Sequence, residues 1–311
     1  MRMLVSACLA ACVVYGQTGA LQPPSAGFVF DQSSQMLRRV QGIPGASLIG
    51  AGVDFGFPIA AATVAPRMDS ALVLAADGTP HLFRVSGASA VEIPISGLTA
   101  PERVVFSPSG TVAALSSNSS VQMIKGLPDA PVLAATVRVH ANSKLRRPVP
   151  ESLSVSDDGA YLLYAAGGPV ELIGVAGDSR KLLDAPPGAL AAFAPVGHDA
   201  AVLHGGTLTI FQDVLGAATR RDVQGISAPS ALVFSSDGRS VFVAGERARE
   251  IYAIDAATGN VSTLSCDCAP TTLSAMGSFF RLNELSEGPL WLLDANAPAP
   301  RLIFIPAKSG M

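Results

Sequence analysis

One short phrase recurs along this chain: an apolar strand end, a tight turn and a second apolar run. It reads FSSDGRSVFVAG from Phe234, and related forms begin at Phe106, Val155 and Phe193. Glycine holds the fifth position in all four copies, because it adopts a positive φ with little strain. A repeated strand–turn–strand phrase restricts the chain to folds that are built from many similar β-hairpins.

The phrase belongs to a longer unit, which is clearest after Ala231. There the segments ALVFS, SVFVA, EIYAID and NVSTL are separated by short turns that include Asp-Gly and Thr-Gly. Four apolar segments of strand length joined by tight turns predict a four-stranded antiparallel meander. Units of this kind start near residues 59, 102, 151, 189, 231 and 270. A four-strand unit that repeats about every 40 residues is typical of a β-propeller.

We therefore predict an all-β fold, a β-propeller of four-stranded antiparallel blades, as a single domain over residues 17–311. Residues 17–58 are predicted to form a partial N-terminal blade, because GFVFD from Gly27 is similar to the second half of a unit, PLWLLD. The chain length favours seven blades at about 42 residues each. Six blades with an N-terminal hairpin outside the ring is the alternative.

The composition agrees with many short buried strands. Hydrophobic residues make up 49% of the chain and charged residues only 14%. No apolar run after the N-terminus approaches the ~20 residues that a membrane-spanning helix needs, so no transmembrane helix is predicted. The net charge of −3 argues against nucleic-acid binding, which normally requires a basic face. We expect a monomer.

The first residues predict export. Arg2 precedes a short apolar segment, and Val14 and Gly16 fit a cleavage site that would leave Gln17 as the first mature residue. Residues 1–16 are thus a predicted signal peptide. LAAC, which ends at Cys12, is similar to a bacterial lipobox and predicts a lipid anchor as the less favoured alternative. Either process places the protein in the periplasm or outside the cell.

The unit after Ala231 resembles the YVTN-type β-propeller repeats of bacterial exported proteins. In those repeats an S-x-D-G turn precedes an apolar strand, and a D-x-x-T-G turn follows the next strand. The similarity is good over residues 231–265 and partial over 102–125 and 151–165. It implies a propeller outside the cytoplasm. Because the family includes binding proteins, surface-layer proteins and some enzymes, the resemblance does not carry a function to this chain.

Neither the aspartates nor the histidines have the spacing of a metal site. The run Asp157-Asp158-Gly159 lacks the alternating oxygen ligands of a calcium loop, so we interpret its side chains as hydrogen-bonding the turn. No His-x-His or Glu-x-x-His pattern joins the four histidines, which are His81, His140, His198 and His204. No cofactor is predicted.

Two local features are candidate sites. The segment VRVHANSKLRRPVP from Val137 falls in the longest interval between units and predicts an enlarged loop, where binding residues often lie. Its cationic side chains could bind a carboxylate, a phosphate or an acidic polysaccharide, or could simply be solvated; they are Arg138, His140, Lys144, Arg146 and Arg147. Cys266 and Cys268 could form a small disulfide, remain reduced, take part in redox chemistry or bind copper, and a structural pair is favoured.

No nucleophile elbow, phosphate-binding loop or dinucleotide fingerprint occurs in the sequence. The predicted function is therefore a binding or scaffold module for a protein or an extracellular ligand. The alternative is an enzyme with an axial site, lactonase-like or another hydrolase. Propellers assemble axial sites from one residue per blade, so a linear motif would not reveal such a site.

Overall fold

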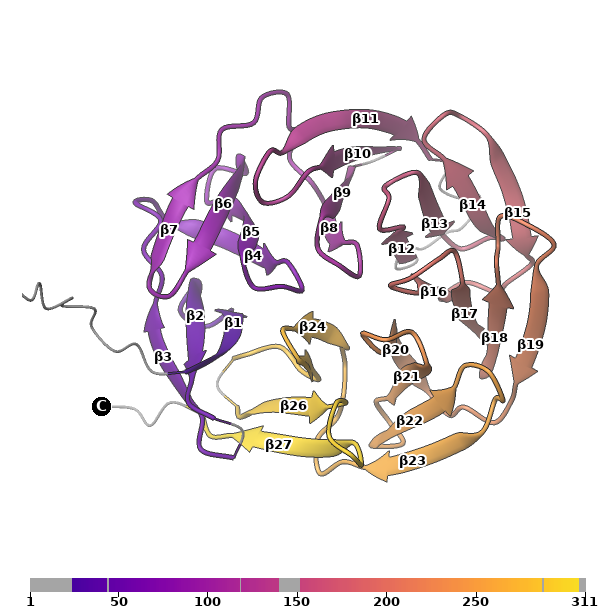
Figure 1. The fold of residues 1–311 in the computed structure, drawn as a ribbon. Helices are drawn as coiled ribbons and strands as arrows, with labels where there is room; N and C mark the ends of the chain where they lie inside the picture. The colour runs from indigo at the N-terminus through magenta and orange to yellow at the C-terminus, as the bar shows by residue number, and fades with distance from the viewer. Residues whose placement is uncertain (1–23, 44, 118, 140–151, 287, 308–311) are drawn as a thin grey trace, which may run out of the picture.

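The computed structural model describes residues 24–43, 45–117, 119–139, 152–286 and 288–307. These residues form seven antiparallel sheets arranged as blades around a central axis (Figure 1). The predicted all-β propeller is confirmed, and seven is the correct number of blades. No apolar helix of membrane-spanning length occurs among the described residues.

Six blades have four strands each, and in every one the chain runs from the axis to the rim. The innermost strands are β4 (Ile59–Val64), β8 (Arg103–Phe106), β12 (Ser152–Val155), β16 (Leu190–Phe193), β20 (Pro229–Phe234) and β24 (Ser274–Met276). The second strands are β5 (Ser70–Ala75), β9 (Val112–Ser117), β13 (Tyr161–Ala165), β17 (Ala200–His204), β21 (Ser240–Gly245) and β25 (Phe279–Arg281). The third strands are β6 (Pro80–Ser86), β10 (Ser120–Lys125), β14 (Val170–Gly174), β18 (Thr207–Gln212), β22 (Glu250–Asp255) and β26 (Leu290–Asp294). The outermost strands are β7 (Ser89–Glu92), β11 (Val132–Arg138), β15 (Ser179–Leu183), β19 (Thr219–Val223), β23 (Val261–Ser265) and β27 (Arg301–Ile305).

The N-terminal blade has three strands in the described residues: β1 (Ser25–Asp31), β2 (Met36–Gln41) and β3 (Leu48–Gly52). Strand β1 is on the axial side and contacts the inner strands β4 and β24 (Figure 1). The hairpin outside a six-bladed ring is therefore wrong, because these strands occupy a place within the ring. The sequence of β1 is similar to the third strand β26, yet β1 is the innermost strand of its own sheet.

The hydrophobic core lies between the blades rather than inside any one of them. Leu203 and Leu208 of one blade, for example, pack against Val241 and Val243 of the next, and all four are at most 1% exposed. Both faces of each sheet are covered in this way, which explains why strands such as β21 are continuous apolar runs without polar alternation.

The repeated phrase forms the turn between the first and second strands. Ser235 Oγ donates a hydrogen bond to Asp237 Oδ1 (2.7 Å), and the Arg239 N–H donates to the same oxygen (3.0 Å). Gly238 has a φ of +72°, in the left-handed region. The bond from Ser235 and the one from the Arg239 backbone lower the pKa of Asp237. The Asp237 carboxylate thus holds the turn in place.

Candidate binding site in the axial channel

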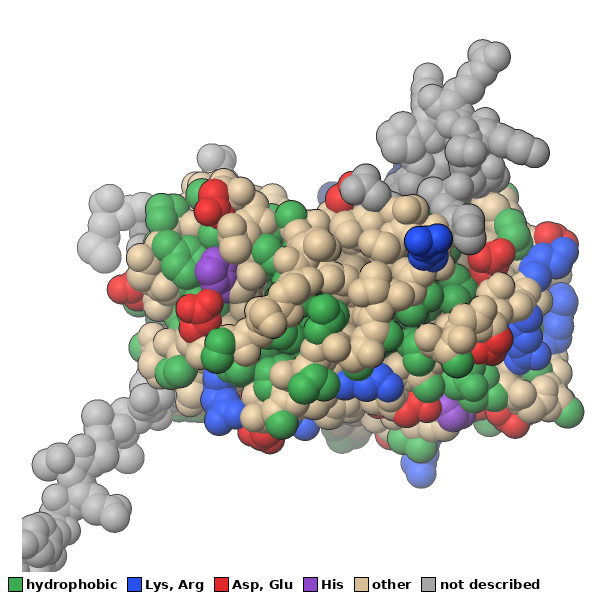
Figure 2. Space-filling model, turned by 90° about the horizontal axis from the view of Figure 1, so that it is seen from above, with side chains coloured by type: hydrophobic (Ala, Val, Ile, Leu, Met, Phe, Trp, Pro, Cys, Tyr) green, Lys and Arg blue, Asp and Glu red, His purple; other side chains and the backbone are tan. Residues whose placement is uncertain are grey.

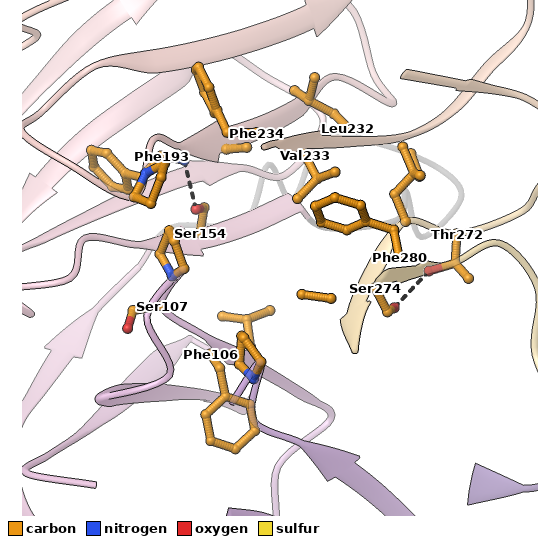
Figure 3. A pocket seen from close by; sticks show the side chains of 18 of the residues that line it. Phe106, Ser107, Ser154, Phe193, Leu232, Val233, Phe234, Thr272, Ser274 and Phe280 are labelled. Carbon is orange, nitrogen blue, oxygen red and sulfur yellow. Dashed lines mark hydrogen bonds between the residues drawn. The ribbon is translucent and has the colours of Figure 1, made fainter. Parts of the chain in front are cut away.

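A cavity of about 840 Å³ runs along the axis. Its wall is built from the six inner strands β4, β8, β12, β16, β20 and β24, the segments that lead into them and the turns that follow them, together with Phe280 of the second strand β25 (Figure 3). Strand β1 contributes no lining residue. A cavity of this size falls within the range of small-molecule and cofactor sites.

The wall of this axial channel combines hydroxyl groups with apolar side chains. The hydroxyl-bearing lining residues are Thr63, Ser107, Ser109, Ser152, Ser154, Ser230, Ser235, Ser236, Thr271, Thr272 and Ser274. Most of the other lining residues are alanine, valine, leucine, proline or phenylalanine. Such a wall offers apolar contact together with many short hydrogen-bonding groups.

Only three charged side chains line the channel in the described residues: Arg67, Arg103 and Asp157. Arg67 Nε donates to Asp69 Oδ2 (2.8 Å). Asp157 Oδ1 accepts a hydrogen bond from the Ser109 N–H (2.7 Å). Arg103 is the first residue of β8 and is exposed. The middle of the channel wall is therefore uncharged.

Several hydroxyls join neighbouring parts of the wall. Ser152 Oγ accepts from the Ala191 N–H (2.9 Å), and Ser154 Oγ accepts from the Phe193 N–H (3.1 Å; Figure 3). These two bonds connect β12 to β16 in the next blade. Ser230 Oγ likewise donates to the Pro270 carbonyl (2.7 Å), across to the segment that leads into β24. Cross-blade bonds of this kind hold the inner strands in fixed positions.

Four phenylalanines take part in the wall: Phe106, Phe193, Phe234 and Phe280 (Figure 3). Phe193 and Phe234 are only 2% and 5% exposed, because their rings pack in the clusters between blades. Three of the four occupy the first position of the repeated phrase.

The described lining contains no histidine, and Asp157 is its one carboxylate. Within the described part of the chain, no three His, Cys, Asp or Glu side chains converge on a common point. His81 Nδ1 is 2.7 Å from Glu92 Oε1, and His198 Nε2 is 3.2 Å from Asp158 Oδ2. Both pairs are away from the channel lining, so these histidines belong to local contacts.

The predicted cationic loop falls largely outside the described residues. His140, Lys144, Arg146 and Arg147 all lie in the range 140–151, which the structure does not describe. Arg138 is the last residue of β11, an outermost strand, and is exposed there. It is not a lining residue of the axial channel.

The sulfur atoms of Cys266 and Cys268 are joined in a disulfide. The two residues are 4% and 7% exposed and belong to the hydrophobic cluster between the last two blades. The same cluster contains Leu273 and Phe280, which line the channel. The disulfide is therefore part of the buried packing between these two blades, in the segment that joins β23 to β24.

The rim carries charges of both signs (Figure 2). Cationic side chains gather over the outermost strands β15 and β19, where Arg180, Lys181, Arg220 and Arg221 are exposed. Two of them form ion pairs with carboxylates nearby in the sequence, Lys181 with Asp184 (2.8 Å) and Arg220 with Asp222 (2.7 Å). Among the described residues, these two pairs reduce the net positive charge of this part of the rim.

Sequence reasoning did not find the lining residues. They come from six separate blades, at positions whose side chains differ from one copy of the phrase to the next. One signal was available: the phrase always begins at the end of an inner strand, so the residues just before it face the axis. Locating the axial residues needed the blade order and the register, which the repeat alone does not give.

The fold and the channel define a β-propeller with a ligand-sized axial cavity. No protein-family model matches the chain, and no curated protein sequence matches it. Similar solved structures include the Kuenenia stuttgartiensis hydrazine synthase, at 12% identity and a TM-score of 0.56 over 94% of this chain and 99% of that one. A functionally unknown protein from Desulfotomaculum acetoxidans DSM 771 shares 13% identity, at a TM-score of 0.58 over 92% and 96%. Apo AztD from Citrobacter koseri shares 11% identity, at a TM-score of 0.56 over 91% and 94%. At these identities the similarity shows the fold alone.

Proposed function

We propose that this chain is an exported β-propeller of the YVTN type that acts as a binding module, with the axial channel as its ligand site. The observation that carries the proposal is the channel itself. A cavity of about 840 Å³ has a wall mainly of hydroxyl and apolar groups, with Arg67, Arg103 and Asp157 as its charged side chains, and cross-blade hydrogen bonds hold the inner strands. Preformed concave sites with a few fixed polar groups are typical of ligand binding.

Two features support the exported location. Residues 1–16 have the pattern of a signal peptide, with lipid anchoring at Cys12 as the alternative. The disulfide between Cys266 and Cys268 suits an oxidising compartment, because disulfides persist mainly outside the cytosol. The YVTN assignment rests on the repeated turn phrases.

The hydrolase alternative is less well supported by the described lining. General acid–base catalysis usually needs a positioned pair of titratable groups. The channel offers Asp157 alone among carboxylates, and that side chain already accepts a hydrogen bond from Ser109.

A screen with matched tryptophan variants tests the proposal. Thr271 lines the channel and is exposed, and Thr263 is exposed on the outermost strand β23. We expect uncharged compounds that raise the melting temperature of the wild type and of Thr263→Trp to have no effect on Thr271→Trp. Ligands that stabilise all three proteins equally would place the binding site elsewhere and contradict the proposal.

A further inference from the structure

Each inner strand lies at the end of its sheet, so one of its edges has no strand partner. In an antiparallel ladder, successive residues direct their N–H and C=O groups alternately to the partner strand and away from it. Every second residue of an inner strand therefore directs its backbone polar groups toward the channel. Such an edge can accept a further strand.

The turns fix which residues face the channel. The Ser235 N–H donates to the Ser240 carbonyl across the turn (2.8 Å), and the Ser107 N–H donates to the Val112 carbonyl in the same way (2.9 Å). Since the Ser235 amide is directed to β21, the alternation directs the backbone groups of Phe234 and Leu232 to the opposite side, toward the channel.

Strand β8 has the same arrangement, with Phe106 and Val104 facing the channel. Strand β16 shows how such an edge can be covered. Its two channel-facing amides, at Ala191 and Phe193, donate to Ser152 and Ser154. Among the described residues, no side chain covers the corresponding amides of β8 or β20 in this way.

Of these two open edges, β20 is the better suited to receive another strand. It has six residues, Pro229 to Phe234, none of them charged; the first five are half-buried, and all but Pro229 line the channel. Strand β8 has four residues and begins at the charged and exposed Arg103. Charged side chains are one feature that prevents strand addition, and β20 has none; Pro229 and the register shift next to it lie at the start of the strand, so the regular open edge is Ala231 to Phe234.

We propose that the channel receives an extended, uncharged peptide segment that pairs with the open edge of β20 as an added strand. This inference rests on the proposed function, since it assigns the chemistry of the ligand to the same channel. An extended backbone repeats its donors and acceptors at the spacing that β20 presents, over about 20 Å for six residues. The uncharged side chains of β20 favour an uncharged segment, because a charged side chain beside them would lose part of its hydration.

The probe is a capped six-residue peptide of serine, valine and threonine, as long as β20. Its control has the same sequence with every internal amide N-methylated, which removes the donors of both peptide edges. Hydrogen exchange of the full chain reports the contact at single amides. We expect the unmethylated peptide to slow hydrogen exchange at the amides of Leu232 and Phe234. The methylated peptide should bind at least about tenfold more weakly.

The variants Thr271→Trp and Thr263→Trp separate this inference from the proposed function. Peptide protection that persists in Thr263→Trp and is lost in Thr271→Trp supports pairing in the channel. Equal binding of both peptides, lost only in Thr271→Trp, overturns the strand pairing while the channel remains a binding site. If neither peptide binds at about 1 mM, the peptide ligand is wrong, and the compound screen alone decides the proposed function.

Discussion

At the scale of single residues, Asp31 shows how one side chain fixes a turn. Its carboxylate accepts hydrogen bonds from Ser33 Oγ (2.6 Å), Ser34 Oγ (2.6 Å) and Arg38 Nε (2.6 Å). Burial alone would raise its pKa, but the bonds from the two serines and Arg38 outweigh that effect and hold the pKa well below its usual range. The contact with Arg38 depends on the register of β1 with β2, which no local pattern gives.

Replacing Asp31 with asparagine should destabilise the protein by about 2–3 kcal/mol near neutral pH, because the Arg38 side chain, only 11% exposed, would lose its carboxylate partner and keep just the Ser34 Oγ and Gly50 carbonyl acceptors. The folded-state pKa lies below the unfolded one, so the stabilising effect of Asp31 is present above about pH 4 and is lost as the pH falls. Urea unfolding at pH 7 and about pH 3 measures both effects. A loss in Asp31→Asn that is the same at both pH values would contradict this account.

At the scale of strands, the sequence predicted the elements well because each strand lies between recognisable turns. A glycine with positive φ holds the fifth position of the phrase in all four copies, at Gly110, Gly159, Gly197 and Gly238, and each of these turns joins a first strand to a second. The sequence could not predict how one inner strand meets the next. That contact depends on the spacing between blades, and the serines of β12 resemble any other strand serines until β16 is placed beside them.

Ser154→Ala tests the bond between these two strands. The Phe193 amide would lose its acceptor in a buried position, which should lower the free energy of unfolding by about 1–2 kcal/mol. Hydrogen exchange at Phe193 should also become faster. Ser236→Ala is the control, since Ser236 is an exposed lining residue. Unchanged hydrogen exchange at the Phe193 amide in Ser154→Ala would show that the bond between Ser154 and Phe193 is not formed.

At the scale of the whole molecule, the repeat period and the chain length predicted seven blades, but not the closure of the ring. The N-terminal and C-terminal blades share a hydrophobic cluster that includes Val29, Val40, Leu290 and Leu292. Closure also needs a close approach at Gly27, where an added Cβ would lie 2.5 Å from Met276 Cγ and 3.0 Å from Met68 Sδ. The contacts of Gly27 with Met276 and Met68 could not be predicted from one sequence, because no local pattern connects residues that far apart in the chain.

Gly27→Ala should therefore weaken ring closure. Gly27 has a φ of +144°, and we expect a loss of about 3 kcal/mol from the combined backbone strain and overpacking. Gly45→Ala is the matched control, because Gly45 has a φ of +87° and no atom within 4 Å of the added Cβ; it should cost about 1 kcal/mol. Equal losses in thermal unfolding would mean that Gly27 has no special role in closing the ring.

The central claim is that the channel presents open strand edges, and hydrogen exchange of the unliganded protein tests it most directly. The amides of Leu232 and Phe234 should exchange at least about tenfold faster than those of Ala191 and Phe193, because only the latter pair has serine acceptors. All four belong to inner strands of the same channel, so the comparison is internal to one experiment. Equal protection of the two pairs would show that the edge of β20 is already covered and would contradict the account.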